Sequence, residues 1–488
     1  MPISPKPMPA LRPPPSTDGV QKLASALAQQ AAHASRPLSA QIHLLANGAE
    51  SQLLVVNGSR LYNVPAALAA RFETALINRD ENLVDALLAE NGLLSPPAIN
   101  DRPLSDPPPH ALSLAIAQKC NLGCGYCYAQ QGGFGGPAKN MAQSTATAAV
   151  DWLLNNTSPG GKINLAFLGG EPLANRAVLR ATTEYAAEQA AAQGFKLGFS
   201  ITTNGTLLNA DDADFFETHG FAVTVSLDGT REIHDRLRPF KGGAGSFEHI
   251  IARTAPLLER QKRMQVSARV TVTPRNLDLP STLDAFIGMG FHSVGFSPLL
   301  NAPESRDEMD VGHLTELLEA MIACGLAFEQ QTLQGRRYPF ANLLGALREL
   351  HRGTHRPYPC GAGAGYLGVS AEGSLSACHR FVDAEAGQLG DLTLGLDASR
   401  QNRWLADRHV HIQEPCRQCW ARYLCGGGCH HEVLARGRAA CDYIRGWLHY
   451  ALQAYGRLSK LNPAGFIDGE PAPWQWEASA PADSPESR

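Results

Sequence analysis

The chain of 488 residues contains 42 Lys and Arg residues against 46 Asp and Glu residues, which gives a formal net charge of −4. This near balance provides no broad basic surface for nucleic acid or an anionic membrane, so we expect neither as a partner. The length suffices for about two to four domains.

The N-terminus, MPISPKPMPALRPPPS, is rich in proline and lacks the apolar stretch of a secretory signal. The sequence contains no run of about 18 apolar residues, the length that would indicate a membrane span. We therefore predict a cytoplasmic protein. The cytosol keeps thiols reduced, so disulfides poorly explain the 11 cysteines. Metal ligation is the better interpretation.

The first hundred residues predict a small separate unit behind an irregular start. Residues 1–38 mix Pro, Ser, Ala and Gln, which predicts disorder with one helix over residues 21–33. Residues 39–97 contain QIHLLANGAESQLLVVNGSRLYNV, which indicates two or three short strands followed by two helical segments. A Pro-rich linker, residues 98–110, ends this unit.

Apolar strands then alternate with helical stretches such as residues 247–263. The predicted strands cover residues 112–117, 163–168, 197–202, 222–227, 265–272 and 292–296. Six such units predict an α/β fold, a partial (β/α)6 barrel of the TIM type. Functional loops in such folds lie at the carboxyl ends of the strands.

Three cysteines follow the first of these strands. The sequence CNLGCGYCY places Cys120, Cys124 and Cys127 on one loop, and small glycines let the backbone wrap closely. Three thiolates on a four-iron cubane leave one iron without a protein ligand. A structural zinc site is the alternative, but zinc prefers four ligands and no fourth Cys or His lies nearby.

The spacing CxxxCx(aromatic)C, with Tyr126 at the aromatic position, resembles the signature of the radical S-adenosylmethionine (SAM) superfamily. This resemblance implies a [4Fe–4S] cluster whose open iron chelates SAM. An electron from the reduced cluster then cleaves the sulfonium bond, and the resulting 5′-deoxyadenosyl radical abstracts a hydrogen atom from the substrate.

Further motifs end the next strands: FLGGEP, ITTNGTLL, VSLDG, and an arginine on the fifth strand. By resemblance they face the amino group, ribose and carboxylate of SAM. Taken singly, each has an ordinary explanation as a turn, a helix cap or an ion-pair partner. Their order at successive strand ends favours the SAM interpretation, and the expected contacts are Gly169, Gly170, Glu171, Thr203, Asn204, Ser226, Asp228 and Arg269.

The C-terminal region contains seven more cysteines in a specific arrangement: Cys360, Cys378, Cys416, Cys419, Cys425, Cys429 and Cys441. The arrangement resembles the SPASM extension of radical SAM peptide maturases, which implies two auxiliary iron–sulfur clusters. By this resemblance one cluster is held by Cys416, Cys419, Cys425 and Cys441, and the other by Cys360, Cys378 and Cys429 with an iron left available.

A zinc ribbon through Cys416, Cys419, Cys425 and Cys429 is the structural alternative for this segment. Cys324 lies in a helical pattern and is expected to be a small buried hydrophobe. His379 follows Cys378, whereas the similar sulfatase-maturing enzymes have an Asp base there. The sequence therefore identifies no catalytic base.

The runs CGGGCHHE, CDYIRGWLHY and CHRFV resemble the maturase of quinohemoprotein amine dehydrogenase. That family forms thioether links between Cys and Asp or Glu carbons in a small subunit. The resemblance implies a polypeptide substrate, whose leader adds to the N-terminal sheet as an edge strand. It also implies a reductant such as flavodoxin or ferredoxin.

Other peptide crosslinkers, sulfatase-type oxidases and a zinc-stapled scaffold that only docks a peptide are the alternative functions. In a thioether mechanism, the substrate thiolate would sit on the open iron beside Cys360, Cys378 and Cys429.

The expected segments are 1–38, disordered; 39–97, small α+β domain; 98–110, linker; 111–305, partial barrel; 306–358, helical connection; 359–445, cysteine-rich cluster domain; and 446–488, C-terminal helix and tail.

Overall fold

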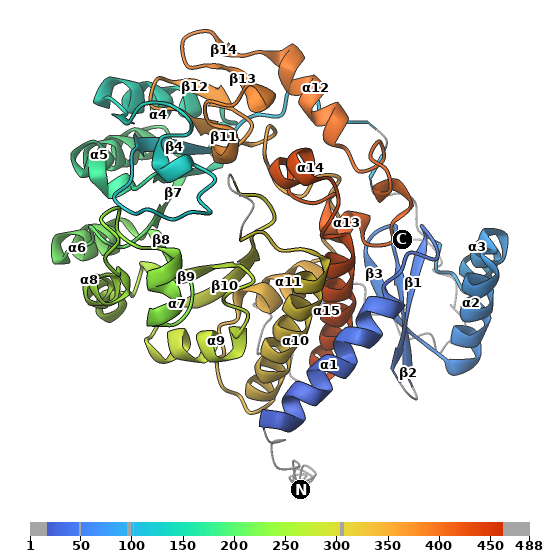
Figure 1. Ribbon diagram of the computed structural model, residues 1–488. Helices are drawn as coiled ribbons and strands as arrows, with labels where there is room; N and C mark the ends of the chain where they lie inside the picture. Colours follow the sequence, from blue (N-terminus) through green and yellow to red (C-terminus); the bar gives the residue numbers. More distant parts are fainter. Residues whose placement is uncertain (1–16, 48–49, 95–98, 101, 303–306, 462–488) are drawn as a thin grey trace, which may run out of the picture.

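The computed structural model describes residues 17–47, 50–94, 99–100, 102–302 and 307–461 (Figure 1). The helices are α1 Thr17–Ala34, α2 Ala66–Asn78, α3 Glu81–Glu90, α4 Gln143–Asn156, α5 Arg176–Ala192, α6 Ala210–His219, α7 Arg231–Leu237, α8 Phe247–Arg260, α9 Leu279–Gly288, α10 Val311–Leu333, α11 Ala341–His351, α12 Ala398–Arg408, α13 Arg422–Cys425, α14 His430–Arg436 and α15 Cys441–Leu461. The strands are β1 Ile42–Asn47, β2 Glu50–Val55, β3 Arg60–Val64, β4 Ala111–Gln118, β5 Lys139–Asn140, β6 Lys162–Gly169, β7 Lys196–Thr203, β8 Ala222–Ser226, β9 Gln265–Val272, β10 Ser293–Pro298, β11 Tyr366–Val369, β12 Ser374–Ser376, β13 Gln388–Asp391 and β14 Gly395–Leu396.

Six parallel strands form the partial barrel that the sequence predicts. Their order is β4-β6-β7-β8-β9-β10, so each strand pairs with the next along the chain. Helices α4, α5, α6, α8 and α9 lie on the outer side of this sheet (Figure 1), whereas Leu237 of α7 packs with the loop after β4. Strand β4 is buried at every position, as expected for a parallel strand covered on both faces. The prediction of fold class is confirmed.

The barrel sheet continues into the cysteine-rich region. Strand β11 pairs in parallel with β4, and β12, β13 and β14 extend the sheet in antiparallel fashion. The segments 111–305 and 359–445, which we predicted as separate domains, therefore share one sheet. The pairing is non-local and leaves no periodic signal in the sequence, so only the folded chain reveals it.

The N-terminal unit is a three-stranded antiparallel sheet in the order β1-β2-β3. Helices α2 and α3 pack against it through a small apolar core that includes Leu53, Phe72 and Leu87, each 0% exposed. Figure 1 shows this unit beside α13 and α15. The strands and helices predicted for this part of the chain are present.

Helix α1 begins within the segment predicted to be disordered and is longer than the helix expected over residues 21–33. Ala24, Ala28 and Ala31 recur at helical spacing and are each 2% exposed. This small-residue face packs against α10 and α15, far away in the sequence. Tertiary packing therefore orders a stretch whose composition alone resembles a flexible one. Residues 1–16 lie outside the described residues.

By length and composition alone, α10 is long and apolar enough to cross a membrane. From the sequence we expected no such segment. In the structure it packs against α1, α9 and α15. Its residues Met321, Ile322 and Cys324 are each 0% exposed. Cys324 thus occupies the buried apolar position that the helical pattern predicts.

Candidate active site

The loop after β4 brings Cys120, Cys124 and Cys127 together. All three pack in one small apolar cluster that includes Leu122 and Tyr126. Burial, with a smaller contribution from the neighbouring thiols of Cys127 and Cys120, raises the pKa of Cys124 to about 12. The thiols are thus close enough to influence one another electrostatically. The structure places them as one group of three, as the motif predicts.

Two glycines let the loop after β6 approach this cysteine loop. A Cβ atom on Gly170 would lie 2.3 Å from the carbonyl oxygen of Lys119, which directly precedes Cys120. Gly169 has φ of +147°, and a Cβ there would lie 2.2 Å from the carbonyl oxygen of Ala117. No side chain fits at either position. Their contact with SAM stays a prediction, but the structure gives both a steric role beside the cysteine loop.

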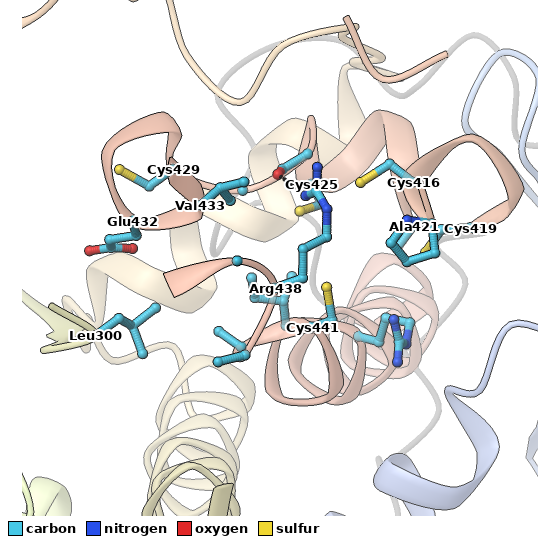
Figure 2. Close-up of a pocket in the computed structure, with 18 of the residues that line it drawn as sticks. Leu300, Cys416, Cys419, Ala421, Cys425, Cys429, Glu432, Val433, Arg438 and Cys441 are labelled. Carbon is cyan, nitrogen blue, oxygen red and sulfur yellow. Dashed lines mark hydrogen bonds between the residues drawn. The ribbon is translucent and has the colours of Figure 1, made fainter. Parts of the chain in front are cut away.

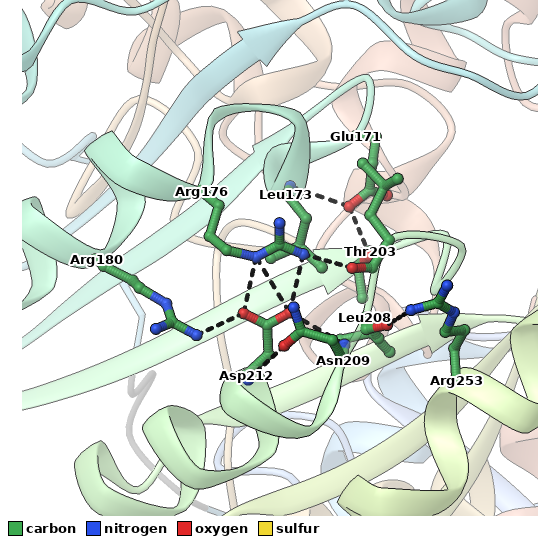
Figure 3. A network of polar contacts seen from close by, with 10 residues as sticks. Glu171, Leu173, Arg176, Arg180, Thr203, Leu208, Asn209, Asp212 and Arg253 are labelled. Atoms are coloured by element: carbon green, nitrogen blue, oxygen red, sulfur yellow. Dashed lines mark hydrogen bonds and ion pairs between the residues drawn. The ribbon is translucent and has the colours of Figure 1, made fainter.

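Glu171 is fully buried and turned into the protein. Its carboxylate accepts hydrogen bonds from Thr203 Oγ1 at 2.7 Å, from the backbone N–H of Asn204 at 2.7 Å and from the backbone N–H of Leu173 at 3.0 Å. Burial raises the pKa of this carboxyl, and these bonds lower it. Glu171 therefore connects the ends of β6 and β7 (Figure 3), and its contact with the SAM ammonium stays a prediction.

The loop after β7 is held from below by a buried carboxylate. Asp212 accepts hydrogen bonds from Arg176 Nε and Arg180 Nη2, both at 2.9 Å (Figure 3). Asp212 also closes the capping box at Asn209 that begins α6. Above this support, Asn204 donates to Asn121 Oδ1 at 3.0 Å and to Cys120 Sγ at 3.5 Å. The end of β7 thus meets the cysteine loop directly.

Asp228, which follows β8, is fully buried beneath the cysteine loop. It accepts from the backbone N–H of Thr271 at 2.8 Å and from the hydroxyl of Tyr126. Arg238 Nη1 lies 3.5 Å from the Asp228 carboxylate and donates to the Tyr126 oxygen at 2.6 Å. The motif aromatic is therefore fixed by a buried Asp–Arg pair. Sequence reasoning missed Arg238, because no spacing rule links it to Tyr126.

Ser226 is half-buried at the end of β8, on the strand next to β9. Arg269 projects from β9 and is solvent-accessible within the barrel, where its guanidinium donates to Ser297 on β10. The SAM contacts predicted for Ser226, Arg269, Thr203, Asn204 and Asp228 stay predictions. The structure places all five at or near the carboxyl ends of neighbouring strands.

The seven C-terminal cysteines fall into two sets. Burial raises the pKa of Cys378 to about 12, and the nearby thiols of Cys429 and Cys360 add to this rise. Burial also raises the pKa of Cys416 to about 12, with a further contribution from its own neighbouring thiols. Those neighbours are Cys425, Cys441 and Cys419. One set thus contains three thiols and the other contains four.

Figure 2 shows the set of four grouped along one pocket, whose far end is lined by Cys429 and Glu432. A zinc ribbon would instead group Cys429 with Cys416, Cys419 and Cys425. Within the described part of the chain, no three His, Cys, Asp or Glu side chains are arranged to hold a single metal ion. Soft thiolates in sets of three and four are the ligands that iron–sulfur clusters use.

A cluster of aromatic and charged side chains connects the first cysteine loop to the set of three. Arg380 lies 5.1 Å from the ring centroid of Tyr128, which follows Cys127. Its Nη1 donates to Glu432 at 2.8 Å and to Cys429 Sγ at 3.5 Å. A single arginine thus joins the two groups of thiols.

Histidines border this cluster. His379 is held by Tyr366, with 2.7 Å between Nδ1 and the hydroxyl, and its ring contacts Tyr128. His431 also contacts the Tyr128 ring, whereas His430 points to Trp404. The adjacent histidines therefore diverge, as expected from helical geometry.

Residues 114–275 match the family model of the Radical SAM superfamily. The chain is 27% identical over 358 residues to a serine-type anaerobic sulfatase-maturating enzyme of Klebsiella aerogenes, covering 70% of this chain and 85% of that one. A cysteine-type sulfatase-maturating enzyme of Clostridium novyi is 32% identical over 163 residues, or 31% of this chain and 41% of that protein.

Solved structures also resemble the fold. The structure of anSMEcpe with bound AdoMet has a TM-score of 0.59 at 19% identity and covers 71% of this chain and 98% of that one. Streptococcus suis SuiB has a TM-score of 0.50 at 13% identity and covers 82% of this chain and 97% of that one. These likenesses support the arrangement of barrel and cysteine-rich region as a known fold.

Proposed function

We propose that this chain, a radical SAM enzyme of the class that modifies peptides or proteins, forms thioether links between Cys and an Asp or Glu carbon of a polypeptide. The proposed substrate is a small Cys-rich subunit of quinohemoprotein amine dehydrogenase. The observation that carries this proposal is the division of seven cysteines into a set of four and a set of three.

The enzyme uses a [4Fe–4S] cluster with SAM and two auxiliary iron–sulfur clusters. The thiols of Cys120, Cys124 and Cys127 would hold the first cluster. When bound, the first cluster and SAM would supply the 5′-deoxyadenosyl radical that abstracts hydrogen. The auxiliary clusters would supply an acceptor for one electron. Thiols must release their protons to become ligands, and burial, which raises the pKa of Cys124 and Cys378, opposes this release until the clusters bind.

The set of three is the proposed place for the substrate thiol. No further cysteine is available to complete it, because Cys324 is buried in α10. Arg380 lies beside this set and contacts Cys429 Sγ, and its positive charge partly offsets the burial that raises the pKa of Cys378. A substrate cysteine would thus meet both a soft-ligand site and a cation at the same place.

The overall reaction balances as a two-electron oxidation of the substrate. The Asp or Glu carbon that forms the link gives up one hydrogen atom, which leaves as part of 5′-deoxyadenosine. The thiol of the substrate cysteine gives up one proton. One electron leaves as the carbon–sulfur bond forms. We propose flavodoxin or ferredoxin as the reductant that starts the cycle, and the cytoplasm as the compartment.

We propose that the N-terminal unit recognises the substrate polypeptide. Strands β1 and β3 are the two edges of its sheet. Helix α15 and α2 contact β1, whereas β3 has its main contacts with β2 alone among the described elements. An extended leader could therefore pair with β3, residues Arg60–Val64, by strand addition.

A sulfatase-type oxidation is the second candidate, favoured by the similarity to a serine-type sulfatase-maturating enzyme over 85% of that protein's length. One difference speaks for the thioether reaction. His379, held by Tyr366, follows Cys378, where the sequence resemblance leads us to expect an Asp base in a sulfatase-type enzyme.

The test is to incubate the reconstituted enzyme, SAM and a reductant with the small subunit, and in parallel with a sulfatase peptide. We expect the subunit to lose two hydrogens per link, with fragment spectra that join Cys to Asp or Glu. The sulfatase peptide should stay unchanged. Oxidation of the sulfatase peptide with an unmodified subunit would overturn the proposal in favour of the second candidate.

A further inference from the structure

Arg269 is a cation inside the barrel that lacks a carboxylate partner among the described residues. On β9 it is the register partner of Gly295 on β10. A Cβ atom at Gly295 would lie 3.4 Å from Arg269 Nη1, so the glycine leaves room for the guanidinium. The Arg269 guanidinium donates a hydrogen bond to the Ser297 hydroxyl. One uncharged partner leaves most of the five donors of a guanidinium unused.

A second guanidinium is fixed by its surroundings. Arg380 is held by Glu432 at 2.8 Å, by Cys429 Sγ at 3.5 Å and by the Tyr128 ring at 5.1 Å. The side chains of Arg380 and Glu432 are 19% and 18% exposed. These contacts fix the position of the group while leaving part of it accessible.

Helix α14 brings Arg380 and its partner to the part of the barrel where Arg269 lies. Arg436 donates to the carbonyl oxygen of Leu300, just after β10, at 2.9 Å. Glu432 precedes Arg436 by one helical turn and shares its face. Figure 2 shows Glu432, Cys429 and Leu300 on the same side of the pocket.

The charges in this region do not balance. Although the Arg269 side chain reaches solvent, the surrounding barrel encloses it enough to lower the pKa of its guanidinium; the positive charge of Arg380 lowers this pKa further, and the carboxylate of Glu432 raises it. Arg436 is paired with Glu308. This leaves Arg269 and Arg380 to share the carboxylate of Glu432 within a partly enclosed space. Such an arrangement favours one additional anion, and the planar fork of arginine suits a carboxylate.

We propose that Arg269, with Arg380, binds the side-chain carboxylate of the acceptor Asp or Glu in the polypeptide substrate. This rests on the proposed function and specifies how the acceptor residue is selected. The site lies between Tyr128, which follows the first cysteine loop, and Cys429 of the set of three. A carboxylate held here places its neighbouring carbon between the two groups of thiols. The SAM carboxylate is the other source of the same chemistry.

The test measures binding and does not depend on turnover. The reconstituted full-length enzyme is titrated with the labelled small subunit and with a matched subunit in which the acceptor Asp and Glu residues are replaced by Asn and Gln. Fluorescence anisotropy gives Kd for each, and equilibrium dialysis gives Kd for SAM. The variants are Arg269→Gln and, as a matched control on the outer helix α8, Arg260→Gln, whose partner is Asp214.

We expect Arg269→Gln to weaken binding of the acidic subunit about tenfold, since hydrogen bonds to charged groups are strong. Binding of the amide subunit and of SAM should change little, and Arg260→Gln should resemble the unmodified enzyme. Loss of SAM affinity with an unchanged ratio between the two subunits would overturn the proposal and assign Arg269 to SAM. Failure of the unmodified enzyme to bind either subunit would overturn the proposed substrate and this site with it.

Discussion

The two groups of three cysteines in this molecule are built in opposite ways. Cys120, Cys124 and Cys127 lie on one loop after one strand, so the spacing alone brings their thiols together. Cys360, Cys378 and Cys429 come from separate segments and meet only because β11 joins the barrel sheet and α14 folds back over it. Local sequence determines the first site, whereas the tertiary fold determines the second.

This contrast explains how the sites differ in chemistry. The first group is enclosed by small residues and a buried Tyr126–Asp228–Arg238 cluster. In the second group, Cys360 and Cys429 are exposed and an arginine lies alongside. A compact enclosed site suits a small cofactor, and an exposed site with a cation suits part of a macromolecule.

The largest expected effect comes from removing one thiol of the first group. We expect Cys124→Ala to abolish SAM cleavage and to reduce bound iron by about four atoms of about twelve per chain. The measurement is 5′-deoxyadenosine by liquid chromatography, with iron and sulfide counted per chain. The control is Cys324→Ala, which removes a buried thiol of α10 and should keep all the iron. Substantial cleavage by Cys124→Ala would contradict the assignment.

The second effect should separate the two groups. In Cys378→Ala we expect crosslinking to stop while SAM cleavage without product continues, because the two groups of thiols come from different segments. Mass spectrometry of the small subunit measures crosslinking, and quantitation of 5′-deoxyadenosine in the same reaction measures SAM cleavage. If Cys378→Ala stopped SAM cleavage as completely as Cys124→Ala, the two sites would not be separable.

A smaller effect tests the close approach of backbone to the first group. Gly170→Ala places a methyl group against the Lys119 carbonyl and the Gly132 Cα, at 2.3 and 2.8 Å. Both contacts are to backbone, which cannot move aside cheaply, so we expect a loss of about 1–3 kcal/mol in stability. Gly288→Ala at the end of α9, where a Cβ would have no atom within 4 Å apart from its chain neighbours and the adjoining helix backbone, is the matched control. Equal midpoints of urea unfolding for the two variants would refute the steric argument.

The smallest effect concerns the contact between the N-terminal sheet and α15. His43 on β1 lies 2.8 Å from His449, from Nε2 to Nδ1, and stacks on Trp420 at 3.8 Å between ring centroids. Burial lowers the pKa of His449 to about 4. Burial also lowers the pKa of His43, with a further contribution from His449.

A histidine that is neutral in the folded protein but titrates near 6.5 when unfolded loses its contribution to stability as the pH falls below 6.5. For His449 the loss at pH 5.5 is about 1.4 kcal/mol. Urea unfolding at pH 7.5 and 5.5 measures the loss in free energy of unfolding between the two pH values. This loss should be about 1.4 kcal/mol smaller in His449→Gln than in the unmodified protein. The same pH dependence in both proteins would show that His449 is not buried in its neutral form.

Much of the fold was predictable from local patterns. All six barrel strands were predicted to within two residues, since apolar alternation and turn residues act locally. The pairing of β11 with β4 was not predictable, because it joins segments about 250 residues apart. The helix α1 was underestimated, because its burial depends on α10 and α15.

The candidate site shows the same division. The loop motif indicated Cys120, Cys124 and Cys127 directly. The sequence did not indicate that Arg238 lies beneath Tyr126, or that Arg380, which follows Cys378 and His379, contacts both Tyr128 and Cys429. Both are isolated arginines whose partners come from distant segments. The role of Glu171 was also not visible, since a carboxylate at a strand end is equally compatible with binding a ligand and with ordering a loop.

The most direct test of the thioether reaction follows the abstracted hydrogen. The small subunit is prepared with deuterium on the Asp and Glu side-chain carbons, or in a second sample on the Cys β-carbon, and is incubated with the reconstituted enzyme, SAM and reductant. We predict deuterium in 5′-deoxyadenosine from the first sample and none from the second. Transfer from the Cys β-carbon alone would contradict the thioether reaction and support oxidation of the sulfatase type.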